Sequence, residues 1–347
     1  MEERALRVLE FDQFLQTLKA YTSTEVGQGL ALTLHPALDP KEIEDLLTEV
    51  TEAEDLLREG SDLPLEGLRE VRPLLLRARA EGACFPPAEL LWMQSTLVAA
   101  RRVKKFLYLA DRRLERLKKW GGRVPEFRGL EENLASTIGS RGEILDSASP
   151  ELNRIRREIM KVRSRIRRTL ENLWSEENLK KIFQDEIITL RNERYVLAVK
   201  ADFKNALPGI IHDQSQSRAT FFIEPFSTVE ENNELNLLLK DEKEEERRIL
   251  LALTAEVREQ SGEIAQAVEI LGRLDLIMAK ARWAREGKGT IAQFAGGRSH
   301  RPFPGKGAEH THYYRSQYGR EDRRPQNLRP LNPDGAVWNS HSRRRGK

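Results

Sequence analysis

A run of apolar residues between Leu152 and Leu173 constrains this fold more than any other feature of the sequence. The apolar positions are three and four residues apart in near alternation, which is the spacing of a coiled-coil seam. A helix with such a seam packs lengthwise along a partner helix. The seam consists of Leu152, Ile155, Ile159, Val162, Ile166, Leu170 and Leu173.

A matching apolar pattern between Leu250 and Leu274 predicts the partner helix. It follows an acidic string, LKDEKEEERR, whereas the first helix is rich in arginine. We therefore expect the two helices to pair antiparallel as an arm. The second seam consists of Leu250, Leu253, Val257, Ile264, Val268, Leu271 and Leu274.

The cationic face of the first helix has two interpretations. We favour a face that is solvated or pairs with the acidic helix; the alternative is a stripe that follows a phosphate backbone. The cations are Arg154, Arg156, Arg157, Lys161, Arg163, Arg165, Arg167 and Arg168.

The segment between the two helices has a different texture, rich in β-branched and aromatic residues. It predicts strands at Ile187–Leu190, Tyr195–Lys200 and Ala219–Glu224, with turns at RNER and NALPG. The string HDQSQSRATFFIEP contains histidine, aspartate and serine, but these lie too close in sequence to form a hydrolase triad. We interpret its polar part as a turn between strands, or secondarily as a surface contact.

The residues before the first long helix predict a helical domain. Asp39 is a good N-cap, Pro40 suits the first helical position, and Gly60 ends the apolar stripe between them. Another helix begins at Pro87, where Trp92 is expected in the core.

Composition narrows the class of protein. Of 347 residues, 39% are hydrophobic, 33% charged and only 7% aromatic, which is typical of a long-helix protein with much solvated surface. The net charge of +3 divides unevenly: from Arg285 onward 14 Lys and Arg face 5 Asp and Glu, a net of +9, so residues 1–284 carry −6. Nucleic-acid binding must therefore come from local patches.

Catalytic and targeting motifs are not evident. The one cysteine, Cys84, suits a reducing compartment and a buried position. Neither a secretory signal nor an apolar run of membrane-spanning length is present, so we expect a cytoplasmic protein without a membrane partner. We find no P-loop pattern and no convincing metal constellation, since His310 and His312 lie in a patternless tail.

Several strings together resemble the bacterial MutS-two family, a paralogue of the mismatch-repair protein MutS. They are LEFDQFLQTLKAYTSTEVGQ, LPLEGLREVRPLLLRA, DSASPELNRIRREI, ITLRNERYVLAVKADF, PGIIHDQSQSRATFFIEP, ENNEL and LDLIMAKARWA. The resemblance extends to about Ala295. It implies a mainly α fold: a MutS-type helical core, a long antiparallel two-helix lever and a small β-rich clamp at its tip. The expected domains are the core at 1–150, the outgoing lever helix at 151–182, the clamp at 183–228, the returning lever helix and core at 229–284, and a basic tail at 285–347.

The resemblance also implies a function. Members of the family are homodimeric ATPases that use ATP and Mg²⁺ to clamp branched or duplex DNA and restrain recombination, or to engage collided ribosomes. Many carry an endonuclease module. Because this chain has no P-loop, we expect it to be truncated before the ATPase domain, to bind no cofactor, to be inactive alone as an enzyme, and to dimerise weakly or not at all. The cations expected to contact nucleic acid, DNA or ribosomal RNA, are Arg191, Arg194, Lys200, Lys204 and Arg218.

The tail predicts a change of reading frame. Permitted codons for Arg315–Arg323, read one base later, spell GPNTGGKT, which is a P-loop. The same offset turns Arg298–Lys306 into GPIDLFQAR, a string similar to one in the family. We therefore interpret 285–347 as frameshifted and disordered, and a non-functional product of a frameshifted gene is the alternative to a clamp fragment.

Overall fold

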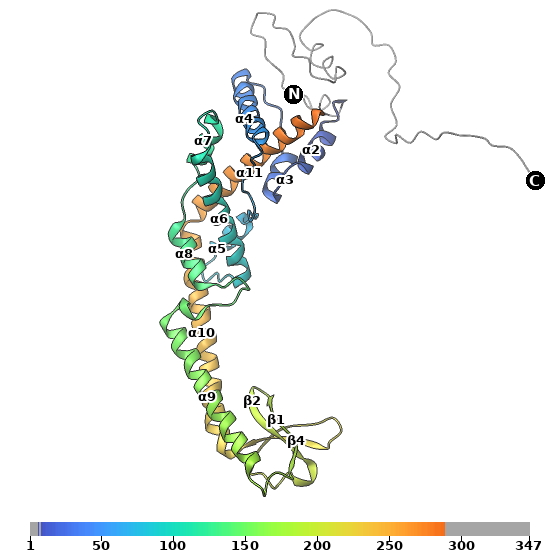
Figure 1. The fold of residues 1–347 in the computed structure, drawn as a ribbon, viewed down its shortest axis with the longest axis vertical. Coiled ribbons are helices and arrows are strands. Elements are labelled where there is room, and N and C mark those ends of the chain that lie inside the picture. Colours follow the sequence, from blue (N-terminus) through green and yellow to red (C-terminus); the bar gives the residue numbers. More distant parts are fainter. Residues whose placement is uncertain (1–5, 7, 289–347) are drawn as a thin grey trace, which may run out of the picture. The chain divides into compact units, whose positions relative to one another are not determined.

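The computed structural model describes residue 6 and residues 8–288. This part of the chain is mainly helical with one four-stranded antiparallel sheet (Figure 1), which confirms the mainly α class. The α-helices are α2 (Phe11–Ala20), α3 (Glu25–Leu32), α4 (Pro40–Arg58), α5 (Arg72–Ala78), α6 (Pro87–Leu109), α7 (Glu115–Gly122), α8 (Arg128–Thr137), α9 (Pro150–Ser175), α10 (Val229–Glu259) and α11 (Ser261–Trp283). The strands are β1 (Phe183–Arg191), β2 (Arg194–Lys200), β3 (Gly209–Gln214) and β4 (Thr220–Pro225). Short 3₁₀ turns span Asp146–Ala148, Ala201–Phe203 and Phe226–Thr228, and a π-helical turn, Ala284–Lys288, follows α11. Among these residues, no helix is both long and apolar enough to cross a membrane.

Local signals define α4 as the sequence predicts. The Asp39 carboxylate accepts a hydrogen bond from the Glu42 N–H, and Pro40 occupies the first turn. At the other end Gly60 has a φ of +79°, and the Ser61 N–H donates to the Leu56 carbonyl at 3.2 Å. This is the left-handed cap that ends many helices, and glycine adopts it without strain.

Helix α11 lies at the centre of the helical body. It is apolar around most of its circumference, as expected for a helix enclosed by others. Residues of α4 to α8 and the last turns of α10 join it in one hydrophobic cluster, in which Phe85 and Met93 are fully buried. Trp92, expected in the core, is instead about half exposed.

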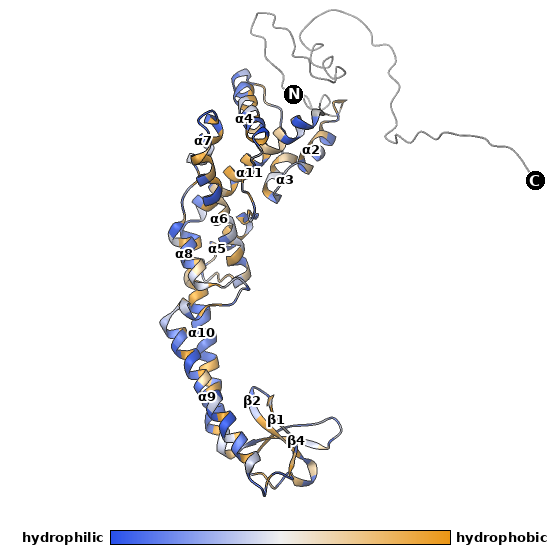
Figure 2. Cartoon of the chain, in the orientation of Figure 1, coloured by the Kyte–Doolittle hydropathy of each residue, from blue (hydrophilic) through white to orange (hydrophobic). Residues whose placement is uncertain are grey.

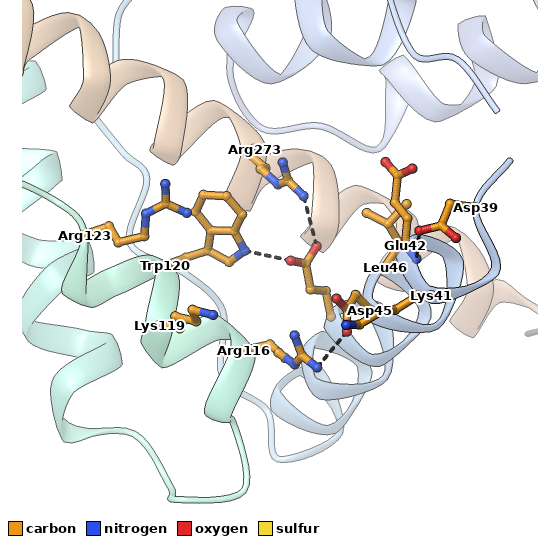
Figure 3. Close-up of a pocket in the computed structure, with 11 residues that line it drawn as sticks. Asp39, Lys41, Glu42, Asp45, Leu46, Arg116, Lys119, Trp120, Arg123 and Arg273 are labelled. Carbon is orange, nitrogen blue, oxygen red and sulfur yellow. Dashed lines mark hydrogen bonds and ion pairs between the residues drawn. The ribbon is translucent and has the colours of Figure 1, made fainter. Parts of the chain in front are cut away.

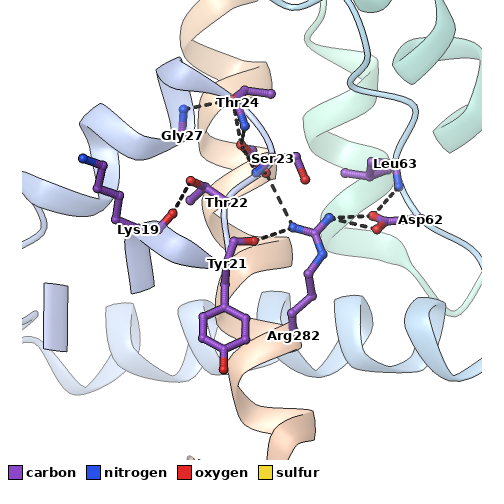
Figure 4. Close-up of polar contacts among 10 residues, drawn as sticks. Lys19, Tyr21, Thr22, Ser23, Thr24, Gly27, Asp62, Leu63 and Arg282 are labelled. Atoms are coloured by element: carbon purple, nitrogen blue, oxygen red, sulfur yellow. Dashed lines mark hydrogen bonds and ion pairs between the residues drawn. The ribbon is translucent and has the colours of Figure 1, made fainter. Parts of the chain in front are cut away.

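Asp275 of α11 fastens helices α2 and α3 to the body. Figure 4 shows Ser23, Thr24 and Arg282 at this junction. The buried Asp275 carboxylate accepts hydrogen bonds from the backbone N–H groups of Ser23 and Thr24, both at 2.9 Å, and from the Thr24 hydroxyl at 2.7 Å. That hydroxyl also caps α3 by accepting from the Gly27 N–H at 3.0 Å. Burial raises the pKa of Asp275, and these hydrogen bonds oppose the shift. Arg282 completes the junction with bonds to Asp62.

Helices α9 and α10 lie side by side (Figure 1), as an antiparallel pair. The α9 seam is buried and α9 pairs with the helix that contains the acidic string, as predicted, but the residues predicted to face the seam were wrong. From Ile155 to Leu170 the seam packs on the sheet and on Leu235, Leu238 and Leu239 of α10. The pattern from Leu250 to Leu274 packs in the body instead, and it spans two helices that meet at Gln260. The spacing of three and four residues indicates that one face of the helix is buried, but it does not identify the element that covers this face.

The sheet has the order β1-β2-β4-β3, with all neighbours antiparallel. The turn predicted at RNER is confirmed: Asn192 and Glu193 both have positive φ, as a two-residue hairpin requires. The turn predicted in the polar part of HDQSQSRATFFIEP is confirmed at 215–219, but it begins later than predicted, because His212 and Asp213 lie in strand β3. β3 has no clear apolar alternation; it forms because β4 offers an edge for pairing. Both edge strands are irregular, with register shifts between Phe183 and Ile188 and between Ile211 and Asp213.

Two polar junctions join the start of α9 to α10. Arg156 hydrogen-bonds Glu242 at 2.7 Å, Glu246 at 2.8 Å, Asp146 at 2.6 Å and the carbonyl of Ile144 at 2.7 Å. Burial disfavours the charged guanidinium, but these acidic partners outweigh it and raise the pKa of Arg156.

The second junction is centred on Glu245. Ser149 caps α9 by accepting from the Leu152 N–H at 2.9 Å, and its hydroxyl donates to Glu245 at 2.6 Å. Hydrogen bonding from Arg248 lowers the pKa of Glu245 to about 2; burial opposes this shift and Ser149 adds to it.

The basic tail predicted at 285–347 lies outside the described residues except for 285–288. The frameshift and the disorder that we predict there remain predictions.

Replacing glycine with alanine should have opposite effects on stability at two positions of α11. A Cβ at Gly272 would lie 2.4 Å from Val26 Cγ1 and 3.0 Å from Leu30 Cδ1, whereas one at Gly262 would meet nothing within 4 Å. We expect Gly272→Ala to lower the free energy of unfolding by about 1–3 kcal/mol through overpacking. Gly262→Ala should raise it by up to about 1 kcal/mol through helix propensity. Urea denaturation measures both, and equal effects would contradict the close approach of α3 to α11.

The contribution of Glu245 to the stability of the fold should depend on pH. Its folded pKa of about 2 lies below the ordinary 4.5, so the stabilisation is complete above pH 4.5 and is lost as the pH falls towards 2. We expect Glu245→Gln to be less stable than wild type at neutral pH, with a gap that narrows below pH 4.5. Urea midpoints across this range measure the gap. Glu171→Gln, which changes an exposed residue of α9, is the control and should show no such narrowing.

Candidate nucleic-acid interface

The sheet is held on the helix pair by a shared apolar cluster. Leu197 and Val199 of β2 and Ile223 of β4 are buried against the α9 seam and Leu235 of α10. Alternation along these strands places such residues on one face, so that face covers the helices. In Figure 2 hydrophilic and hydrophobic segments alternate along the α9–α10 pair.

A buried polar network ties the same strands to α10. Glu224 is fully buried, and its carboxylate accepts from Arg194 at 2.7 Å and from the Asn232 amide at 2.9 Å. His212 Nε2 lies 2.5 Å from its other oxygen. Asn232 also bonds both backbone groups of Tyr195, at 3.0 and 3.2 Å. A buried carboxylate with these partners fixes the sheet against the first turn of α10.

Two of the five predicted contact residues are engaged within the fold. Arg194 is the partner of Glu224, and its second amine donates to Asn233 at 2.5 Å. Arg191 stacks on Phe222, with its guanidinium carbon 4.2 Å from the ring centroid, and its Nε lies 3.3 Å from Asp213. Arg191 therefore reaches from edge strand β1 to residues of β4 and β3, and covers part of the sheet.

The other three predicted residues lie at separate places around the sheet. Lys200, at the end of β2, donates to the Lys181 carbonyl at 3.2 Å. Lys204, in the β2–β3 connection, approaches the Phe221 ring at 5.8 Å. Arg218 occupies the β3–β4 turn with a φ of +58°, and its guanidinium has no ion pair within residues 8–288. The structure therefore does not bring the five cations together as one patch.

Charge around the sheet is nearly balanced. Residues 176–228 contain 7 Lys and Arg against 8 Asp and Glu, a net of −1. Helix α9 contains 8 against 3, a net of +5, and α10 contains 5 against 10, a net of −5. The strongest positive charge beside the sheet is thus on α9, for which the sequence analysis gives a phosphate-following stripe as the alternative interpretation.

Two cavities lie on the helical body. The first, of about 340 Å³, is formed by α4, α7 and α11 (Figure 3). There the Trp120 indole N–H donates to Glu49 at 2.7 Å, and Arg273 stacks on the same indole at 4.3 Å. The second, of about 930 Å³, runs between α6, α7 and α8, and most of its cations are held by Glu126, Glu131 or backbone carbonyls.

Neither cavity fits the ATP that the resemblance implies. A P-loop needs glycines that free backbone N–H groups for phosphate. The first cavity has no glycine in its lining, and the glycines of the second, Gly121 and Gly122, lie within helix α7. Across the described chain, no group of three or more His, Cys, Asp and Glu side chains is placed to hold a metal ion. We therefore assign no role to ATP within the described residues.

The described chain is thus a helical body from which a helix pair carries a small sheet. It matches no protein-family model. It is similar to curated proteins named Endonuclease MutS2: it is 38% identical to that of Bacillus cytotoxicus over 293 residues, 84% of this chain and 37% of the relative. To that of Geobacillus thermodenitrificans it is 39% identical over 288 residues, 82% and 37% of the two.

These similarities support membership of the MutS2 family, as the sequence motifs predict. The chain spans little more than a third of the length of the relatives that it matches.

Measurements of stability can test whether Arg194 and Arg218 have different environments. Arg194→Met removes a donor from fully buried Glu224 and should lower the free energy of unfolding by about 1.5–3 kcal/mol. Arg218→Met changes an exposed side chain and should stay within about 0.5 kcal/mol of wild type. Equal losses in thermal and urea unfolding would contradict the buried network.

Proposed function

We propose that this chain is the nucleic-acid-engaging part of a MutS2-like protein. In this proposal α9 and α10 form the lever, the sheet is the clamp at its tip, and the pair engages duplex or branched DNA. Two findings support it: the similarity to Endonuclease MutS2 proteins, and the attachment of the sheet to both helices at once.

The attachment of the sheet carries the proposal. The α9 seam crosses from the body, where Leu152 is buried, to the sheet, where Leu170 is buried. Asn232 and Glu224 add a polar link from the sheet to α10. A sheet held by a packed core and a satisfied network moves with its helices, whereas one on flexible linkers would not. A change at the body end of the pair would therefore displace the sheet as one piece.

Contacts with DNA would be made mainly to phosphates. Of the five predicted cations, Lys204 and Arg218 are exposed and Lys200 is half-buried, and none of these three has an ion pair within residues 8–288. They lie at the end of a strand, in a connection and in a turn. None of them lies on an element, such as a helix that enters a groove, from which it could read bases. Binding should therefore depend strongly on salt and weakly on sequence.

The whole protein's activities belong to the same proposal. The resemblance implies ATP-coupled motion, a homodimer, and DNA or ribosomes as the large partner. We expect ATP and Mg²⁺ to bind outside the described residues, and this chain to supply the arm that the motion displaces.

Charge reversal tests the sheet as a contact. Lys200→Glu/Lys204→Glu/Arg218→Glu should weaken binding to a junction and to a duplex by about tenfold or more at low salt, because phosphate attraction becomes repulsion. Fluorescence anisotropy with labelled DNA measures the dissociation constant. The matched control is Arg102→Glu/Lys105→Glu/Arg112→Glu, which changes three exposed cations of the body by the same charge. If the two triple variants bind equally well, the sheet is not the contact.

A further inference from the structure

The cations of α9 divide into two groups that the sequence does not distinguish. Half are neutralised: Arg156 and Arg165 by acids of α10, and Arg154 and Lys161 by glutamates one turn earlier on α9. The other half have no ion pair or hydrogen bond from their side chains within the described part of the protein. These four exposed residues, the arginine face, are Arg157, Arg163, Arg167 and Arg168.

The arginine face is unfavourable for the helix alone. Arg163 and Arg167 are one turn apart, as are Arg157 and Lys161, and like charges at this spacing destabilise a helix. Acidic residues, or alternating charges, would keep this helix face solvated equally well. Elsewhere on the α9–α10 helix pair, at Arg156 and Arg165, the cations form ion pairs with acids. An unmatched set beside a matched one indicates a partner that supplies the negative charge.

The residue type and the spacing indicate the chemistry of that partner. All four positions are arginine, whose guanidinium binds phosphate through two parallel hydrogen bonds. From Arg157 to Arg168 the helix rises about 16 Å. Duplex DNA carries one phosphate per about 1.7 Å of its axis, so several phosphates lie within that length. Met160, exposed among the arginines, adds a flexible apolar surface without charge.

We propose that the arginine face of α9 is a second DNA-backbone contact, separate from the sheet, which grips duplex DNA alongside the lever. The inference rests on the proposed function and extends it: the partner touches the side of the helix pair as well as its tip. The opposite charge of α10 then orients the arm, because only the α9 side attracts DNA.

The acidic helix of a second copy is the main competing occupant. Helix α10 carries a net charge of −5, equal and opposite to the +5 of α9. Its acids are partly consumed, however, since Glu234, Glu242, Glu245 and Glu246 already hold arginines of the same chain. The occupied acids of α10 therefore favour a phosphate backbone as the occupant, and DNA-binding and sedimentation measurements separate the two.

The decisive experiment compares two double variants of the full chain with wild type. Arg163→Gln/Arg167→Gln removes two charges of the arginine face and keeps good helix formers. Arg102→Gln/Lys105→Gln removes the same charge from exposed positions on α6. Binding to a short labelled DNA duplex is measured by anisotropy between about 50 and 200 mM salt. Residues beyond 288 are common to all three proteins, so their contribution cancels.

The salt dependence gives the expected result. Each neutralised phosphate contributes about 0.9 to the slope of log K against log salt, so the arginine-face variant should lose about 1.8 from the slope and bind about tenfold more weakly at low salt. The α6 variant should keep the wild-type slope. Unfolding curves check that both variants remain folded.

The remaining outcomes separate the inference from the proposed function. If wild type binds DNA but the arginine-face variant keeps its slope, the inference fails and the proposed function stands. If wild type does not bind, the proposed function itself fails. A variant that changes only self-association, measured by sedimentation, would show a contact between copies and overturn the inference. Duplex RNA bound with the same loss of slope supports backbone recognition, and binding of RNA alone overturns the assignment to DNA.

Discussion

The apolar stripe of α9 is the interaction on which the rest of this structure depends. One end of it is buried in the helical body and the remainder in the cluster that includes α10 and the sheet. Each fully buried leucine, isoleucine or valine contributes roughly 1.5–3 kcal/mol. Without this stripe neither the first turns of α10 nor the sheet would have a face to pack on, because a four-stranded sheet of this size needs an apolar partner layer for stability. The polar junctions at Ser149, Arg156 and Asn232 then determine how the packed parts are oriented.

Much of the fold is predictable because its signals are local. The N-cap and proline at the start of α4, the left-handed glycine after it and the seam of α9 each depend on residues a few positions apart. What failed depended on distant partners. β3 contains few β-formers and exists because β4 pairs with it. The pattern from Leu250 to Leu274 was assigned to the arm, although its neighbours are helices of the body.

The candidate site shows the same division. From the sequence, Arg194 and Arg218 are equivalent turn-flanking cations. The difference between them is Glu224, thirty residues along the chain from Arg194 and fully buried beside it. The α9 cations likewise form one run in the sequence. The position of α10 shows that Arg156 and Arg165 are neutralised by its acids, so charge patterns identify candidate surfaces but not the free members of each.

The irregular edges of the sheet have a consequence for many copies of this chain at high concentration. Both β1 and β3 are edge strands with exposed apolar residues, including Ile187 and Ile211. Regular strands of this kind would template the addition of another chain, and crowding would promote that aggregation. The bulges interrupt the row of backbone donors and acceptors on each side. Neighbouring molecules can therefore lie close together without their sheets joining.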